Sequence, residues 1–181
     1  MKRHLCSLLL VAFVISSIVP GIAATPSCDH DPFAGTWQLN PQKSRYPGAT
    51  CPKRMVIVMA CAGNGVRYRS ETTYADGHSS RSEYTANYDG REAIVMGSGG
   101  LLLPVALKRL DAYTVVATYK RGGQTVATSR RVVSRDGRKM TITTNSPDQS
   151  GKNVLSIVSM RRKVKSQPLN EIRTTRKTFP M

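Results

Sequence analysis

The sequence predicts an all-β protein, an antiparallel up-and-down meander that closes into a barrel of about 8–10 strands. After residue 30 the chain is a series of short runs rich in Val, Ile, Thr and Tyr, and no run of any length has a helical period. Turn sequences such as AGNG, ADGH, YDGR, RGGQ and RDGRK separate these runs. Their Asn-Gly, Asp-Gly and Gly-Gly pairs supply the positive φ of tight hairpins. Closure into a barrel protects the edge strands best, and an open sandwich is the alternative.

Residues 1–24 are expected to be a secretory signal peptide. Basic residues at positions 2–4 precede an apolar run over 5–19, and Ala23 and Ala24 suit a signal peptidase. A membrane anchor is the competing interpretation, but an apolar run of about 15 residues is shorter than the roughly 20 that span a bilayer. The sequence therefore predicts a secreted or periplasmic protein.

The mature chain divides into a barrel domain, residues 25–161, and a basic tail, residues 162–181, that we expect to be disordered. The expected strands lie at 35–40, 54–60, 65–74, 80–88, 92–96, 103–110, 113–120, 124–134, 138–144 and 153–161. A domain of this length is sufficient for one substantial core.

Cys28, Cys51 and Cys61 follow the signal peptide, and an exported protein favours a disulfide. Cys51 and Cys61 flank an expected strand, which separates them by much more than the roughly 7 Å that a disulfide allows between Cα atoms. Cys28 precedes the first strand and Cys61 ends the second, and these ends meet in an antiparallel pair. We predict a Cys28–Cys61 disulfide; the absence of any disulfide remains open.

Positive charge is concentrated in the second half of the chain. The formal net charge is +16, and residues 101–181 carry 17 basic and 4 acidic side chains, against 8 and 7 in residues 25–100. Such a field attracts anions, so an anionic envelope surface is an expected partner of the basic half. A well-solvated surface is the simpler interpretation. We expect no specific nucleic-acid partner and a monomeric protein.

Strict alternation along two expected strands indicates which side chains face the barrel interior. In 66–74 and 80–88, Tyr, Ser and Thr alternate with charged residues, and charged rows belong in water. The predicted inner row therefore contains Tyr68, Tyr84, Tyr88 and, from a later strand, Tyr119. An interior of this kind mixes apolar surface with hydroxyl groups, as ligand cavities do. A barrel filled by its own side chains is the alternative.

Arg130 and Arg131 are adjacent in the expected strand 124–134, so a regular strand must direct one of them inward. We expect Arg130 to face the interior. A buried guanidinium needs a partner, and the predicted inner rows contain no carboxylate, which makes a ligand anion the candidate. A bulge, or a position at the rim of the barrel, would remove this argument.

The Gly-Thr-Trp triplet in FAGTWQLN, on the first strand after a signal peptide, resembles the G-x-W motif of the lipocalins at Gly35 and Trp37. The wider stretch 31–161 resembles small exported bacterial barrel proteins of lipocalin type. The resemblance implies that Gly35 lets the first strand bend and that Trp37 plugs the closed end of the barrel. It also implies an Arg across the Trp ring, for which Arg161 is the first candidate and Arg162 the second.

No catalytic, metal-binding or cofactor motif accompanies these features, because His30 and His78 lie in loops and neither C-x-x-C nor H-E-x-x-H occurs. We therefore expect a protein that is not an enzyme and carries neither a metal nor a cofactor. The leading prediction is a barrel that binds a small lipid-like or aromatic anionic ligand in its interior. The alternatives are a protein-binding barrel, such as a protease inhibitor, and an envelope-associated protein that binds polyanions.

Overall fold

The computed structural model describes residues 30–47, 51–99, 102–148 and 150–163, which fold into one antiparallel 11-stranded sheet and a short 3-10 turn. In chain order the elements are β1 (Gly35–Leu39), η2 (Pro41–Lys43), β2 (Pro52–Ala62), β3 (Gly65–Tyr74), β4 (Ser79–Asn87), β5 (Asp89–Ala93), β6 (Met96–Ser98), β7 (Val105–Asp111), β8 (Thr114–Arg121), β9 (Gln124–Val133), β10 (Lys139–Pro147) and β11 (Asn153–Arg162). The predicted all-β fold is confirmed.

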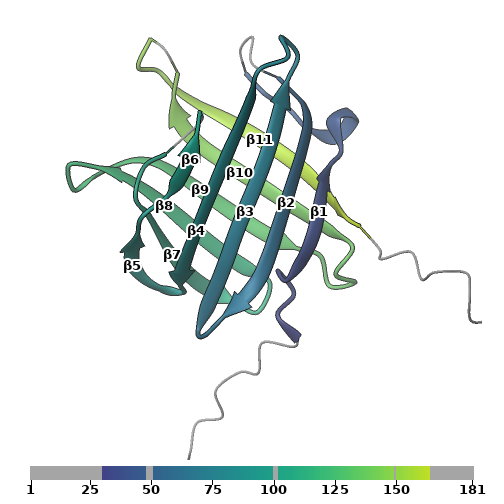
Figure 1. Cartoon of the computed structure of the whole chain (residues 1–181), viewed down its shortest axis with the longest axis vertical. Coiled ribbons are helices and arrows are strands. Elements are labelled where there is room, and N and C mark those ends of the chain that lie inside the picture. The colour runs from purple at the N-terminus through teal and green to yellow at the C-terminus, as the bar shows by residue number, and fades with distance from the viewer. Residues whose placement is uncertain (1–29, 48–50, 100–101, 149, 164–181) are drawn as a thin grey trace, which may run out of the picture.

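The sheet curls into a barrel-like shape. Its strand order is β5-β7-β8-β9-β10-β11-β1-β2-β3-β4-β6, so most neighbours are consecutive in the chain and the meander is confirmed. β1 pairs with both β2 and β11, which brings the first and last strands side by side. Figure 1 shows β1–β4 lying across the strands from β7 to β11, with the interior between them.

The two edge strands of the sheet, β5 and β6, are consecutive in the chain, so the segment that joins them runs from one edge of the sheet to the other. The run expected as a single strand at 92–96 is two strands, because β5 pairs with β7 at one edge and β6 pairs with β4 at the other. Gly97 makes the second pairing feasible: its φ is +152°, and a Cβ there would lie 2.0 Å from the Arg81 carbonyl oxygen. The strand count therefore exceeds the expected number, and β5 and β6 end the sheet without a ladder between them in the described chain.

The hairpin of β8 and β9 contains a bulge that sets the register of β9. Gly122 and Gly123 form its turn with φ of 56° and 80°, as the Gly-Gly signal predicts. Lys120 pairs with Thr125, but the next residue, Tyr119, pairs with Ala127, so Val126 has no partner on β8. An extra residue of this kind bends a strand and shifts the register of everything beyond it.

The interior of the barrel has two halves. At the closed end, where β1 begins and β11 ends, large apolar side chains are fully buried and include Phe33, Trp37, Met140 and Met160. The open end is formed by the β3–β4, β8–β9 and β10–β11 turns, and polar side chains line the wall there. The closed half is a dry core, whereas the open half contains the cavity described next.

Candidate ligand-binding site

A cavity of about 500 Å³ occupies the open half of the barrel. Its walls come from both sides of the curled sheet: Met55 and Ile57 on β2, Ser129 and Arg131 on β9, and partners from β3, β8, β10 and β11. The wall combines aliphatic, aromatic and hydroxyl-bearing side chains with a single buried cation. This combination is typical of a site for a small molecule, in which a few polar groups orient an apolar body.

Arg131 is that cation, and only 3 % of its surface is exposed. Its Nη1 donates a hydrogen bond of 2.8 Å to the Tyr84 hydroxyl, and its Nη2 donates one of 3.3 Å to the Tyr119 hydroxyl. The guanidinium carbon lies 4.9 Å from the ring centroid of Tyr68. Its Nε is buried with no hydrogen-bond partner among the described residues. No carboxylate of the described chain forms an ion pair with it, so its charge is compensated only by neutral phenols.

The phenols of Tyr68 and Tyr84 stay protonated at neutral pH. Burial raises the pKa of Tyr68 and of Tyr84, because it disfavours the phenolate. Burial alone would lower the pKa of Arg131, but the surrounding tyrosine oxygens more than offset this and keep the guanidinium charged. Because the oxygens of Tyr84 and Tyr119 accept from Arg131, each hydroxyl still has a proton to donate. Within the cluster, one N–H of Arg131 and the protons of these two hydroxyls are therefore not used in the hydrogen bonds between Arg131 and the tyrosines.

The structure corrects the prediction for Arg130, whose side chain is exposed on the outer surface, while Arg131 faces the cavity. A hairpin without a bulge would pair Val115 with Arg130 and direct that residue inward. The bulge at Val126 pairs Val115 with Arg131 instead. Cross-strand partners share a face of the sheet, and Val115 is buried, so Arg131 is buried with it.

Three of the predicted tyrosines meet at this site. Tyr68 and Tyr84 point inward, as the alternation predicts, and their rings stack with centroids 4.6 Å apart and an angle of 10°. Tyr119 lines the cavity from β8. Its side chain is half-buried, and its ring has no aromatic or cationic partner among the described residues.

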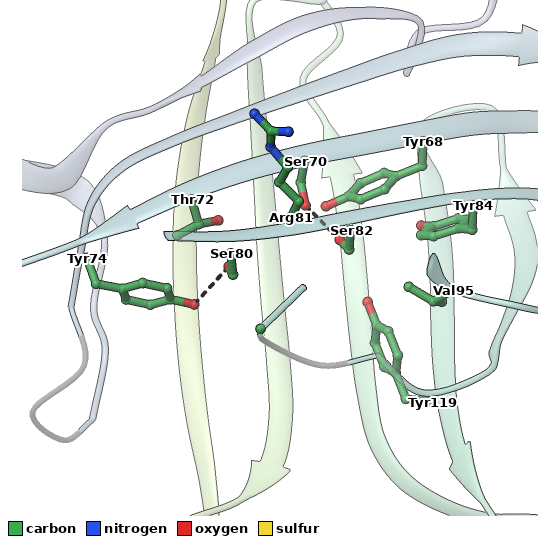
Figure 2. A pocket seen from close by; sticks show the side chains of 11 residues that line it. Tyr68, Ser70, Thr72, Tyr74, Ser80, Arg81, Ser82, Tyr84, Val95 and Tyr119 are labelled. Atoms are coloured by element: carbon green, nitrogen blue, oxygen red, sulfur yellow. Dashed lines mark hydrogen bonds between the residues drawn. The ribbon is translucent and has the colours of Figure 1, made fainter. Parts of the chain in front are cut away.

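A smaller hydroxyl-rich lobe of about 140 Å³ adjoins the main cavity and shares Tyr68, Tyr74 and Tyr119 with it. Figure 2 shows Ser70, Thr72, Ser80 and Ser82 from β3 and β4 around this lobe, with Val95 at its edge. The Ser70 and Ser82 hydroxyls are 2.7 Å apart, and the Ser80 hydroxyl is 3.5 Å from that of Tyr74. The guanidinium of Arg81 points away from these serines in the same view. The lobe, which we call the serine lobe, is polar but carries no charge of its own.

Two further groups flank the open end of the cavity. The ring of Tyr74 stacks on His78 with centroids 4.1 Å apart, and Nδ1 of His78 lies 2.5 Å from a carboxylate oxygen of Asp76. Deeper in the cavity, the hydroxyls of Ser129 and Thr144 are 2.5 Å apart. Neither the histidine nor these hydroxyls featured in the predicted site, because isolated polar residues in a turn or a strand carry no distinct sequence signal.

At the closed end, Trp37 is fully buried and its Nε1 donates a 2.9 Å hydrogen bond to the Phe33 carbonyl, as expected for a plug. The arginine over its ring is Arg162 rather than Arg161, at 4.3 Å from guanidinium carbon to ring centroid. The register explains this correction, because Arg162 is the residue of β11 that pairs with Trp37. Arg161 pairs with Gln38 and is exposed.

Arg162 also caps the chain that precedes β1. It donates 2.5 Å hydrogen bonds to the Pro32 and Gly137 carbonyls and a further bond to the Ala34 carbonyl. Gly35 lies beside the guanidinium with φ of +134°, and a Cβ there would be 2.5 Å from Nη1 of Arg162. The role of Gly35 is therefore to admit this arginine as well as to bend the strand.

Tyr88 belongs to the closed end and does not line the cavity, which corrects its assignment as a ligand contact. Its hydroxyl donates a 3.3 Å hydrogen bond to Asp31, and its ring lies 4.1 Å from the guanidinium carbon of Arg109. Arg109 and Asp31 form an ion pair of 2.6 Å. Burial raises the pKa of Tyr88, and the neighbouring Asp31 carboxylate raises it further. This ion pair could not be predicted from the sequence, because Asp31 and Arg109 are 78 positions apart.

The predicted Cys28–Cys61 disulfide cannot be placed, because Cys28 lies outside the described residues. Cys61 is the second-last residue of β2, at the closed end, where it pairs with Val66 of β3, while Cys51 precedes the opposite end of β2 and is exposed. The expected separation of Cys51 from Cys61 is confirmed.

No protein-family model and no curated protein matches this chain. The site is therefore interpreted from its own geometry. No cluster of three or more His, Cys, Asp or Glu side chains with metal-binding geometry occurs among the described residues. Nor does that part of the chain contain a helix long and apolar enough to cross a membrane.

Proposed function

We propose that this protein is an exported, non-enzymatic binding protein that holds a small anionic ligand in the open half of its barrel. The acidic group of the ligand lies at Arg131, and its apolar body lies against Tyr119 and the aliphatic wall. One observation carries the proposal: a cation with only 3 % of its surface exposed lines an open cavity, and its Nε has no partner.

The physical argument rests on the free energy of burying charge. An unpaired buried cation costs several kcal/mol, and the only hydrogen-bond partners of Arg131 among the described residues are the phenol oxygens of Tyr84 and Tyr119. An anion in the cavity beside Arg131 would add charge-assisted hydrogen bonds, which are about twice as strong as neutral ones. The hydroxyl of Tyr119, which lines the same cavity, would add a donor to the same anion. We infer that Arg131 is kept in the barrel for a ligand rather than for stability.

Two expectations drawn from the sequence complete the proposal. The expected signal peptide, residues 1–24, lies outside the described residues, and export remains part of the proposal. The resemblance of Gly35 and Trp37 to the lipocalin motif is in keeping with a barrel that is plugged at one end and open at the other.

The test is calorimetric titration of the full mature chain with four monoanions: benzoate, cinnamate, 4-hydroxycinnamate and decanoate. We expect at least one to bind, and to bind at least about tenfold more weakly to the Arg131→Met variant, since a charge-assisted bond contributes about 1.5–3 kcal/mol. Arg130→Met is the matched control, because that neighbouring arginine is exposed and should leave affinity unchanged.

Thermal unfolding of both variants separates binding from folding. We expect Arg131→Met to be at least as stable as the parent without ligand, because an apolar isostere relieves the buried charge. Binding of none of the four anions, or equal losses in the two variants, would overturn the proposed function.

A further inference from the structure

We propose that the natural ligand is a hydroxylated aromatic monoanion rather than an aliphatic acid, with its hydroxyl group in the serine lobe. This inference rests on the proposed function and names the class of ligand that the same site selects. It follows from the chemistry of the three surfaces that a ligand anchored at Arg131 would meet.

The first surface is the aromatic wall between the two cavities. Tyr68 is already stacked on Tyr84 and lies beneath the guanidinium of Arg131. Tyr119 lines both the main cavity and the serine lobe, and its ring is without an aromatic or cationic partner in the described chain. A ligand ring stacked on Tyr119 would lie within reach of both the arginine and the lobe, since the Tyr119 hydroxyl itself accepts from Arg131. Stacked aromatic pairs gain free energy beyond the area that they bury.

The second surface is the serine lobe itself. Ser70, Thr72 and Ser80 are each at most 9 % exposed, so bulk water compensates them little. Ser70 and Ser82 form a hydrogen bond with one another, which uses the proton of one hydroxyl and one lone pair of the other. The second proton and the other lone pairs are left for further hydrogen bonds. All four side chains line the lobe, and Figure 2 shows them gathered on one face of the paired strands β3 and β4.

The third consideration is what an aliphatic ligand would do here. A hydrocarbon chain in the lobe would bury four hydroxyl-bearing side chains without giving them a partner, which is unfavourable. A ligand hydroxyl can both donate to and accept from them. A lobe of about 140 Å³ suits one small substituent and not an extended chain. A site built around hydrogen-bonding groups also discriminates strongly against analogues that lack the matching group.

The experiment compares 4-hydroxycinnamate, cinnamate and decanoate by calorimetric titration of the parent protein and of three serine variants. We expect 4-hydroxycinnamate to bind about five- to tenfold more tightly than cinnamate, the size of one net hydrogen bond, and decanoate to bind most weakly. Ser80→Ala and Ser82→Ala should each reduce the preference for the hydroxylated ring. Ser79→Ala is the matched control, because Ser79 is the exposed neighbour of Ser80 and should preserve the preference.

The outcomes separate this inference from the proposed function. If decanoate binds as tightly as 4-hydroxycinnamate and both require Arg131, the ligand class is wrong and the anion site stands. If the preference for the hydroxyl survives in both Ser80→Ala and Ser82→Ala, the serine lobe is not its site and the inference fails. If no monoanion binds, both fail. Because Ser82→Ala leaves Ser70 without its partner, Ser80→Ala provides the second variant should Ser82→Ala not fold.

Discussion

At the scale of single residues, each of two pairs of adjacent arginines has one side chain inside the barrel and one on its outer surface. Arg131 lies in the cavity wall and Arg162 lies over the Trp37 ring, while Arg130 and Arg161 are exposed. Each pair has the same chemistry and neighbouring positions. What differs is the face of the strand, because successive side chains point to opposite sides of a sheet.

The different roles of Arg161 and Arg162 can be tested by measuring the free energy of unfolding of two variants. Arg162→Met removes hydrogen bonds to three backbone carbonyls and the contact with the indole ring. We expect the free energy of unfolding in urea to fall by about 2–3 kcal/mol, because bonds from charged donors contribute about that much. Arg161→Met, the matched surface change, should alter it by less than about 0.5 kcal/mol. Equal losses from the two substitutions would contradict the assignment of Arg162 as the cap of the plug.

At the scale of elements, the bulge in β9 determines which arginine the cavity contains. Val126 is the unpaired residue, and beyond it Ala127, Ser129, Arg131 and Val133 all face inward. The two glycines of the β8–β9 turn would by themselves set a register that is one residue different. The functional side chain is therefore positioned by an irregularity several residues away from it.

Deleting Val126 provides a test of this element. The deletion removes the bulge but preserves all later pairs of β9 with β8 and β10, so Arg131 stays inside. We expect the free energy of unfolding to fall by no more than about 1 kcal/mol, the effect of a typical single mutation, and anion binding to persist. Deletion of Thr143, which pairs regularly on both sides in β10, is the control and should prevent folding. Loss of the fold on deletion of Val126 would show that the bulge is needed for more than register.

At the scale of the whole molecule, the barrel is divided into a dry half that stabilises it and a polar half that holds the cavity. Trp37, Phe33, Met140 and Met160 fill the first half. Tyrosine, serine, threonine and aliphatic side chains line the second half, together with the buried Arg131. This division resolves the alternatives of a filled and a hollow barrel, because each describes one end. Apart from Arg131, the buried ionisable side chains of the described residues are tyrosines.

Alkaline titration should reveal that interior. Burial raises the pKa of four of the seven tyrosines, to about 12 for Tyr46 and above the usual value for Tyr68, Tyr84 and Tyr88. The unfolded chain ionises its tyrosines near pH 10. The stability that these groups contribute is therefore complete below about pH 10 and is lost as the pH rises toward their raised values.

We expect the tyrosinate absorbance of the folded protein at about pH 11 to fall short of that of the protein unfolded in guanidinium at the same pH. Tyr84→Phe is the control variant and should make this difference smaller by one tyrosine. Full ionisation near pH 10 without unfolding would show that the phenols are in contact with water and that the interior is not as described.

The sequence by itself determined the meander, the position of most strands, and the inward row of Tyr68, Tyr84 and Tyr119. All of these depend on local information, namely a period of two residues and glycine-containing turns. The tertiary structure alone decided that Arg131 and Arg162 face inward, that Tyr88 binds Asp31, and that β5 and β6 lie at opposite edges of the sheet. Each of these depends on register between strands, where a shift of one residue exchanges the two faces, and a bulge that sets such a shift has no strong signal in the chain that contains it.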